Sequence, residues 1–281
     1  MKIELKADSA TREYSVSKHF KFRDAPGNDS APGTQYTEEV SVAIDRSRSS
    51  GIVAKVERRN VRKDGKRFCP NPVEHYFIKS GEVLNKLELQ LTADGKIEKV
   101  LNREEILKNW EYTRIYLDNY FVSRDENVLS TIKGWTQQIE SIIKDERRYL
   151  QIVESDLLYN RFFYGYWMDY GKNGQMIVTQ FFPGVFGAAR TVLTEELAVS
   201  ETDGIRKVEI VGYLNKEESD LAAIAETLGM KETQLEGLCV DLKGMCLFDA
   251  DGMIEKIEMK ADANLSDTDL QRSFSLIVSR R

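Results

Sequence analysis

The side chains best suited to chemistry are scarce in this chain of 281 residues, which holds three cysteines and two histidines. A thiolate nucleophile needs a base within about 3 Å, and His is the usual base near neutral pH. Cys69 and His75 share one segment, but the prolines in it indicate a turn-rich loop with a buried Cys and a surface His. Cys239 and Cys246 lack the CxxC spacing of a zinc site and are interpreted as core residues. We expect no catalytic residue, metal or cofactor, although a site built from carboxylates leaves little trace in one sequence.

Basic side chains are concentrated between Arg46 and Arg67, although the whole chain has a net charge of −6. Alternating valines and Asp64-Gly65 predict a hairpin there. A basic ribbon can follow a phosphate backbone or dock on an acidic protein. Nucleic acid ranks lower, because Phe68 is the only aromatic residue nearby for base stacking. A third alternative is that the charges only keep a sheet edge soluble. The candidate partner-binding residues are Arg58, Arg59, Arg62, Lys63, Lys66 and Arg67.

Aromatic residues form a second cluster between Tyr159 and Tyr170, and further phenylalanines follow. Such a cluster can line an apolar ligand cavity or form a binding surface. Alternatively, the rings fill the junction between helices and a sheet, where each buries a large area. We favour this second interpretation. If the cluster does line a pocket, its candidate residues are Phe163, Tyr166, Trp167 and Phe182.

Three segments recur in the same order, each shifted by 157 positions (for example 194 − 37). The sequence of 37–42 returns at 194–199, and that of 93–100 returns at 250–257, while Pro26-Gly27 matches Pro183-Gly184. One such match could be chance, but three at one shift indicate an internal duplication. The paired acids Glu38-Glu39 and Glu195-Glu196 recur with it, and we interpret them as solvent-facing strand starts.

The repeated unit has the pattern of antiparallel β structure. Apolar residues alternate with polar ones over 40–45, as in a strand with one buried face. Asp94-Gly95 and Asp251-Gly252 each stand between two such strands, which predicts hairpins. A calcium loop is the alternative, but the position of its first ligand is Leu247, so the turn is preferred.

Between the copies the apolar period changes to that of a helix. Val128, Ile132, Trp135, Ile139 and Ile142 lie at spacings of four and three, and two or three helices are expected over 102–161. This stripe is interpreted as core, with a partner groove or a homo-oligomer seam as alternatives. A shorter helical insertion near 216–228 has no counterpart in the first copy.

These patterns predict an α+β fold of two related antiparallel β-sheet units with a helical insert between them. The expected boundaries are 1–101 for the first unit, 102–165 for the insert and 166–281 for the second unit. No apolar run approaches the roughly 20 residues of a membrane span, and without a signal-peptide pattern we expect a cytoplasmic protein.

The sequence contains neither a phosphate-binding loop nor a catalytic motif. The basic segment and the high aromatic content therefore favour a non-enzymatic protein-binding module, such as an adaptor, chaperone or neutralising partner. Its partner would be another protein with an acidic surface. The alternative is a carrier or sensor of an apolar small ligand, held between a curved sheet and the helical insert. An enzyme is a third hypothesis, which predicts a cleft of converging polar groups with shifted pKa values.

Overall fold

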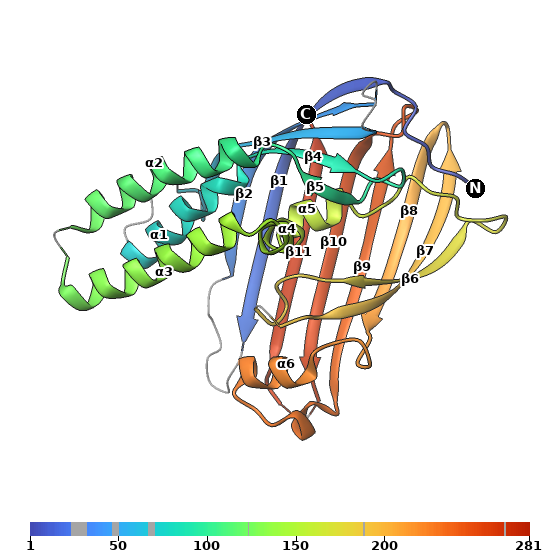
Figure 1. Ribbon diagram of the computed structural model, residues 1–281. Helices are drawn as coiled ribbons and strands as arrows, with labels where there is room; N and C mark the ends of the chain where they lie inside the picture. The colour runs from blue at the N-terminus through green and yellow to red at the C-terminus, as the bar shows by residue number, and fades with distance from the viewer. Residues whose placement is uncertain (24–32, 47–50, 67–70, 123, 188, 267) are drawn as a thin grey trace.

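A single sheet of eleven antiparallel strands forms the frame of the protein (Figure 1). The computed structural model describes residues 1–23, 33–46, 51–66, 71–122, 124–187, 189–266 and 268–281. The strand order is β5-β4-β3-β2-β1-β11-β10-β9-β8-β7-β6. The first and last strands therefore lie side by side, with Tyr14 opposite Arg280 and Arg23 opposite Gln271. The expected α+β class is confirmed, but the strands join in one sheet instead of two.

The strands fall in two groups along the chain. The first group is β1 (Ser9–Arg23), β2 (Thr34–Asp45), β3 (Ile52–Lys63), β4 (Lys86–Leu91) and β5 (Ile97–Val100). The second is β6 (Gln175–Phe181), β7 (Val192–Thr202), β8 (Ile205–Leu214), β9 (Leu238–Phe248), β10 (Ile254–Leu265) and β11 (Gln271–Arg280). Along most strands buried residues alternate with more exposed ones, because only one face of the sheet is covered.

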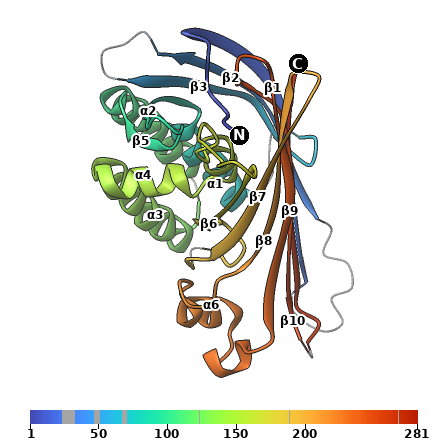
Figure 2. The same cartoon turned by 90° about the vertical axis from the view of Figure 1, so that its right-hand side faces the viewer.

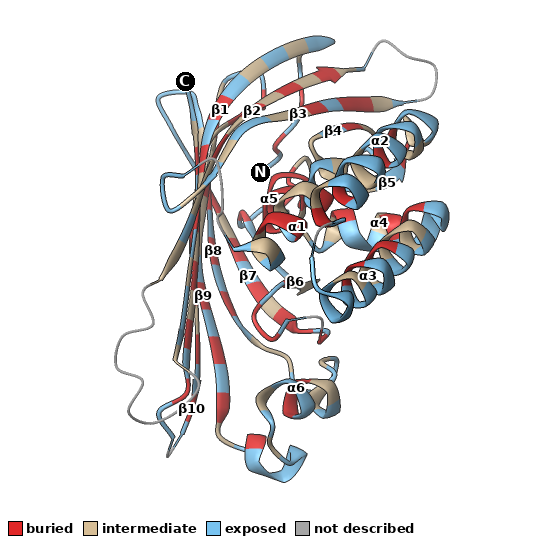
Figure 3. Ribbon diagram, turned by 90° about the vertical axis from the view of Figure 1, so that its left-hand side faces the viewer, coloured by how far each residue is buried: buried red, intermediate tan, exposed pale blue. Residues whose placement is uncertain are grey.

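The covered face of the sheet carries the helices (Figures 2 and 3). Between β5 and β6 lie α2 (Arg103–Phe121), α3 (Glu126–Lys144), α4 (Glu146–Glu154) and α5 (Leu157–Phe162), four helices where two or three were expected. The main hydrophobic core fills the space between these helices and the sheet. A smaller core of Tyr76, Leu117, Phe121 and Ile132 holds the ends of α2 and α3 that project beyond the sheet (Figure 1). None of the helices in the described part of the chain is long and apolar enough to cross a membrane.

A helix stands where the sequence indicated a loop. Helix α1 (Pro72–Ser80) begins at Asn71, whose side chain accepts hydrogen bonds from the N–H groups of Val73 and Glu74, and Pro72 suits the first helical position. A 3₁₀ turn, η1 (Gly81–Leu84), follows. His75 is consequently buried and not on the surface, while Cys69 lies outside the described residues.

Each half of the sheet has a short helix between two of its strands. Helix α6 (Leu221–Leu228) and the 3₁₀ turn η2 (Glu232–Leu235) stand between β8 and β9. Helix α1 and η1 stand in the corresponding place, between β3 and β4. The expectation that only the second half carries such a helix was therefore wrong, because the capping pair Asn71-Pro72 was taken for a turn.

The predicted Asp-Gly turns are present. Lys63 and Lys66 exchange two backbone hydrogen bonds of 2.9 Å around Asp64 and Gly65, both of which have positive φ angles. Gly95 and Gly252 also have positive φ, and they join β4 to β5 and β9 to β10. Pro26-Gly27, the first of the repeated segments, lies outside the described residues.

Candidate functional site: a pocket between the sheet and helices α1 and α2

A pocket of about 980 Å³ lies between the first three strands and the helices α1 and α2. Its floor and one wall come from β1, β2 and β3, and the opposite wall comes from α1, η1 and Tyr116 of α2. Asp156, the residue that precedes α5, closes it at the bottom. Strands of the first half and helices that follow them in the chain thus build one concave site.

Four charged side chains form the floor of this pocket. They are Lys18 of β1, Glu38 of β2, Arg58 of β3 and Asp156. Lys18 Nζ lies 3.0 Å from Glu38 Oε1 and 3.2 Å from Asp156 Oδ1. Arg58 donates from Nε to Glu38 Oε2 at 2.5 Å and from Nη1 to Asp156 Oδ2 at 3.1 Å. Each cation therefore contacts both carboxylates, and we call these residues the charged floor.

The alternation of the strands brings the charged floor together. Tyr14 and Val16 of β1 point into the core, so the next residue of the same phase, Lys18, does so as well. Glu38 stands in the same phase as Val40 and Val42 of β2 and is as buried as they are. On the helical side, Asp156 is fixed because it caps α5 and accepts the Leu158 N–H at 2.9 Å.

The charged forms of Asp156 and Arg58 are stabilised by their neighbours on the floor. Burial opposes the ionisation of Asp156, but Lys18, Arg58 and the hydrogen bond from Leu158 hold its pKa well below the ordinary value. Burial likewise disfavours the charged form of Arg58, yet Asp156 and Glu38 raise its pKa above the ordinary value. Both groups are thus charged at neutral pH.

Aromatic rings line the walls of the pocket above this floor. Phe20 and Tyr36 meet edge to face on the strand side, with ring centroids 6.0 Å apart. On the helical side Phe77 and Tyr116 are both partly exposed. His75 lies between the helices, where its Nε2 is 3.1 Å from the Tyr116 hydroxyl. The walls therefore offer apolar and aromatic surface next to a polar floor.

His75 is held in its neutral form. Its ring stacks on Tyr120 with centroids 4.3 Å apart. Burial, and after it the charge of Lys79, lowers the pKa of His75 below the ordinary value, while Glu82 acts in the opposite direction. Neutral imidazole is thus the form that the pocket wall contains at neutral pH.

A second buried carboxylate lies outside the pocket, on the other half of the sheet. Glu195 of β7 and Arg161 of α5 are both fully buried, and two hydrogen bonds of 3.0 and 3.1 Å join them. The hydroxyl of Tyr164 donates to the same carboxylate at 2.7 Å. Helix α5 is therefore held at both ends, by Glu195 through Arg161 and by the charged floor through Asp156.

Glu38 and Glu195 were expected to face solvent, and that expectation was wrong. In each Glu-Glu pair the first residue points inward and the second outward, as strand alternation requires. Glu39 accepts from Arg281 at 2.9 Å on the outer side, and Glu196 is exposed. The inward carboxylates are tolerated because cations from other segments pair with them.

The structure distributes the predicted basic residues over several environments. Arg58 is part of the charged floor. Arg59 and Lys63 also line the pocket, and they pair with Glu57 at 2.7 Å and with Glu74 at 2.5 Å. Arg62 and Lys66 are exposed. Arg67 lies outside the described residues.

The residues of the alternative ligand pocket belong to the core. Phe163, Tyr166 and Phe182 are each less than a tenth exposed, and Tyr166 packs edge-on against Phe248 with centroids 5.4 Å apart. Trp167 is partly buried and donates from its indole N–H to the carbonyl of Gly252 at 2.9 Å. These rings therefore have the packing role that was favoured for them.

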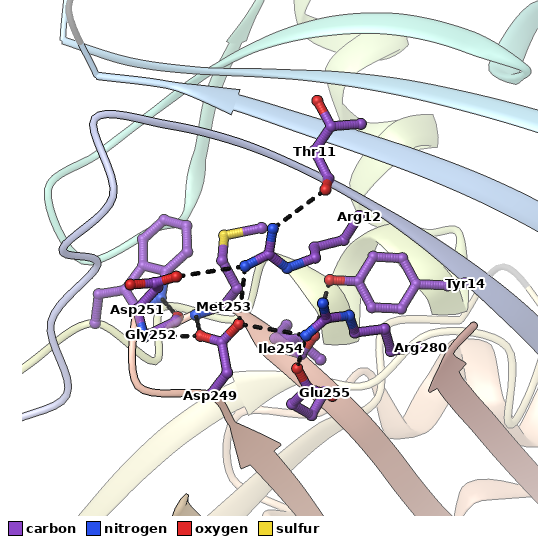
Figure 4. A network of polar contacts seen from close by, with 11 residues as sticks. Thr11, Arg12, Tyr14, Asp249, Asp251, Gly252, Met253, Ile254, Glu255 and Arg280 are labelled. Carbon is purple, nitrogen blue, oxygen red and sulfur yellow. Dashed lines mark hydrogen bonds and ion pairs between the residues drawn. The ribbon is translucent and has the colours of Figure 1, made fainter. Parts of the chain in front are cut away.

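The turn that resembled a calcium loop is held by arginine (Figure 4). Arg12 Nη2 lies 3.1 Å from Asp249 Oδ2 and 3.4 Å from Asp251 Oδ2. The other oxygen of Asp249 accepts the N–H groups of Asp251 and Met253, each at 2.9 Å. A guanidinium from β1 thus takes the place between the carboxylates, and the turn ties β9 and β10 to the first strand.

Sequence reasoning reached part of the pocket and missed the rest. Arg58, Arg59 and Lys63 were singled out, but Lys18, Glu38 and Asp156 were not. The signal for Lys18 was its position in an alternating series, Tyr14-x-Val16-x-Lys18-x-Phe20, in which every other member is apolar or aromatic. A charged residue at such a position points to the same side of the strand as the buried residues. For Glu38 the signal was its recurrence at Glu195.

Comparison with known proteins places the chain in no family. No protein-family model and no curated protein sequence matches it. Among solved structures it is similar to a chain titled "lipid-protein interactions in lipovitellin", with 8% sequence identity and a TM-score of 0.47. The match covers 99% of this chain and 25% of that one, so this chain spans about a quarter of the other chain's length. A resemblance of this strength carries no functional argument, and the site alone has to support a function.

Proposed function

We propose that this protein binds a small amphipathic molecule, without transforming it, in the pocket between β1–β3 and the helices α1 and α2. One observation carries the proposal: a concavity of about 980 Å³ combines aromatic walls with a charged floor. Ligand pockets of proteins commonly measure 300 to 1,000 Å³ and combine apolar walls with a few fixed polar groups. The expected carrier of a ligand between a curved sheet and helices is thereby proposed again, with a different set of lining residues.

The two carboxylates of the charged floor favour binding over catalysis. Glu38 and Asp156 are both held by Lys18 and Arg58, and the pKa of Asp156 is lowered and not brought near neutrality. General acid–base catalysis works best with a pKa near the working pH. The floor instead presents fixed charges, which orient a ligand.

Binding of 8-anilinonaphthalene-1-sulfonate, measured by fluorescence titration, tests the pocket. Tyr116 lines it, whereas Tyr112, one turn earlier on α2 and 63% exposed, does not. We expect Tyr116→Ala to raise the dissociation constant about five- to tenfold, through the loss of one ring contact. Tyr112→Ala should leave the constant unchanged.

A second matched pair comes from α1, where Phe77 lines the pocket and the similarly exposed Val73 does not. Phe77→Ala should weaken binding of the dye, and Val73→Ala should not. No dye binding by the wild type, or equal losses within each pair, would contradict the proposal.

A protein partner with an acidic surface is the second candidate function. The exposure of Arg62, near the end of β3, and of Lys66, just after the Asp64-Gly65 turn, favours it. A partner that copurifies from the native cells should be lost from a variant carrying Arg62→Glu and Lys66→Glu. It should be kept by Lys243→Glu, an exposed change on β9. Retention by both variants would exclude a binding role for this surface.

We also propose that the chain contains one unit twice, over 1–101 and 166–281, with 102–165 between the copies. The shift of 157 relates the buried acids Glu38 and Glu195. It also relates Gly95 and Gly252, which both adjoin Trp167. In an experimental structure, β2, β4 and β5 should superimpose on β7, β9 and β10 at this register. A better superposition at another register would refute the duplication.

A further inference from the structure

The charged floor has more hydrogen-bond donors than its own acceptors use. Asp156 accepts from Lys18, Arg58, Leu158 and Tyr159, which occupies the roughly four acceptor positions of a carboxylate. Glu38 is likewise contacted on one oxygen by Lys18 and on the other by Arg58. The carboxylate of Asp156 therefore has little capacity left for a further donor, whereas Glu38 Oε1 forms an ion pair with Lys18 but accepts no hydrogen bond within the described residues.

The cations keep donors to spare. A guanidinium carries five N–H groups and an ammonium three. The bonds from Arg58 use Nε and Nη1, and within the described residues no partner is bonded to its Nη2. A polar group that enters the pocket and reaches the floor thus meets N–H donors.

The side chains that line the pocket carry a net positive charge. Five cationic side chains and four carboxylates line the pocket, and His75 is neutral. On the walls Lys63 pairs with Glu74 at 2.5 Å and Lys79 with Glu82 at 2.7 Å. The excess positive charge belongs to Arg59, whose partner Glu57 does not line the pocket. A ligand with an anionic end is therefore attracted, and its charge is stabilised where water is partly excluded.

The walls of the pocket indicate that the part of the ligand outside its anionic end is apolar or aromatic. Phe20 and Tyr36 present rings from the strands, and Phe77 and Tyr116 present rings from the helices. An apolar or aromatic body between these walls buries surface on both sides, which the anion alone would not do.

We propose that the ligand is an organic anion whose acidic oxygens bind Lys18 and Arg58 and whose apolar body lies between the aromatic walls. This inference rests on the proposed function and adds the chemical class of the ligand. It makes Arg58 the residue that determines specificity for a negative charge, through the N–H groups of Nη2.

Isothermal titration with three probes that share one ring system tests the charge. The probes are 2-naphthoate, the neutral 2-naphthamide and the cationic 2-naphthylmethylammonium. We expect 2-naphthoate to bind about tenfold more tightly than the amide, because hydrogen bonds to charged groups are the stronger ones. The cation should bind most weakly. Added salt should weaken the binding of 2-naphthoate and leave the binding of 2-naphthamide unchanged.

Variants of two arginines on β3 show whether Arg58 contacts the ligand. Arg58→Lys keeps the charge but removes the fork of N–H groups, and it should reduce the preference for naphthoate over naphthamide to about twofold or less. Arg62→Lys, an exposed residue of β3 that does not line the pocket, should keep the full preference. If Arg58→Lys does not fold, the salt dependence of naphthoate binding to the wild type tests the proposal instead. Naphthoate binding that does not weaken with added salt would then contradict it.

The possible failures are distinguishable. Equal binding of naphthoate and naphthamide, or tighter binding of the cation, would overturn the anionic class and leave the pocket proposal intact. Binding of the anilinonaphthalene dye without binding of naphthoate would do the same. If neither the dye nor any naphthalene probe binds, both the anionic class and the proposed function are wrong.

Discussion

At the scale of single residues, the inward acids Glu38 and Glu195 determine how the helices are attached to the sheet. Their recurrence could be read from the sequence, but their burial could not, because either member of a Glu-Glu pair can take the inward phase. The choice depends on cations that arrive from distant segments, Arg58 for one and Arg161 for the other. Sequence spacing does not reveal such pairings.

The pair of Arg161 and Glu195 predicts a large loss of stability in Arg161→Met. This change leaves Glu195 fully buried without its cation, and breaking a buried ion pair costs about 3 to 5 kcal/mol. Urea unfolding should measure this loss. The exposed pair of Arg59 and Glu57 is the control, and Arg59→Met should change the midpoint little. Similar effects of both changes would contradict a structural role for the buried pair.

His75 predicts a pH dependence of stability. Because its folded-state pKa is lowered, the unfolded chain binds a proton that the folded chain does not, and stability falls as the pH drops below about 6.5. In His75→Gln this contribution is absent. Urea unfolding at pH 7.5 and pH 5.5 should show a smaller loss for the variant than for the wild type. Equal losses would mean that His75 titrates normally in the folded protein.

At the scale of elements, turns and strands were predictable where local chemistry decides them. Asp64-Gly65, Asp94-Gly95 and Asp251-Gly252 all form the turns expected of them, because a glycine accepts positive φ at little cost. Helix α1 was missed, since Asn71 and Pro72 suit a helix start as well as a turn. The outcome depends on the packing of Tyr76 and His75 against α2, which is a tertiary effect.

The Asp-Gly turns predict a graded series of alanine variants. Gly204 has positive φ and open space around it, so Gly204→Ala should cost only the backbone strain, about 1 to 2 kcal/mol. At Gly95 an added Cβ also meets the Trp167 ring at 2.6 Å, and at Gly252 it meets the backbone of Glu4. Gly95→Ala and Gly252→Ala should therefore lower the melting temperature more than Gly204→Ala. An equal decrease in all three would show that the close packing has no energetic weight.

At the scale of the whole molecule, a curved sheet is covered on one face by helices from the middle of the chain. The class and the helical region could be predicted, because periodicity is a local property. The pairing of β1 with β11, which joins both halves into one sheet, could not, because it links the two ends of the chain. The pocket depends on that global arrangement, and the sequence therefore indicated its basic residues but not its place.

Hydrogen exchange with saturating 2-naphthoate, followed by mass spectrometry, tests most directly whether this pocket binds a ligand. Bound ligand should slow the exchange of amides in residues 72–84, which form α1 and η1, and at the ends of β2 and β3 near Tyr36 and Lys63. Exchange in α6, at 221–228, should be unchanged. Protection that is absent from 72–84, or that appears mainly elsewhere, would contradict the account.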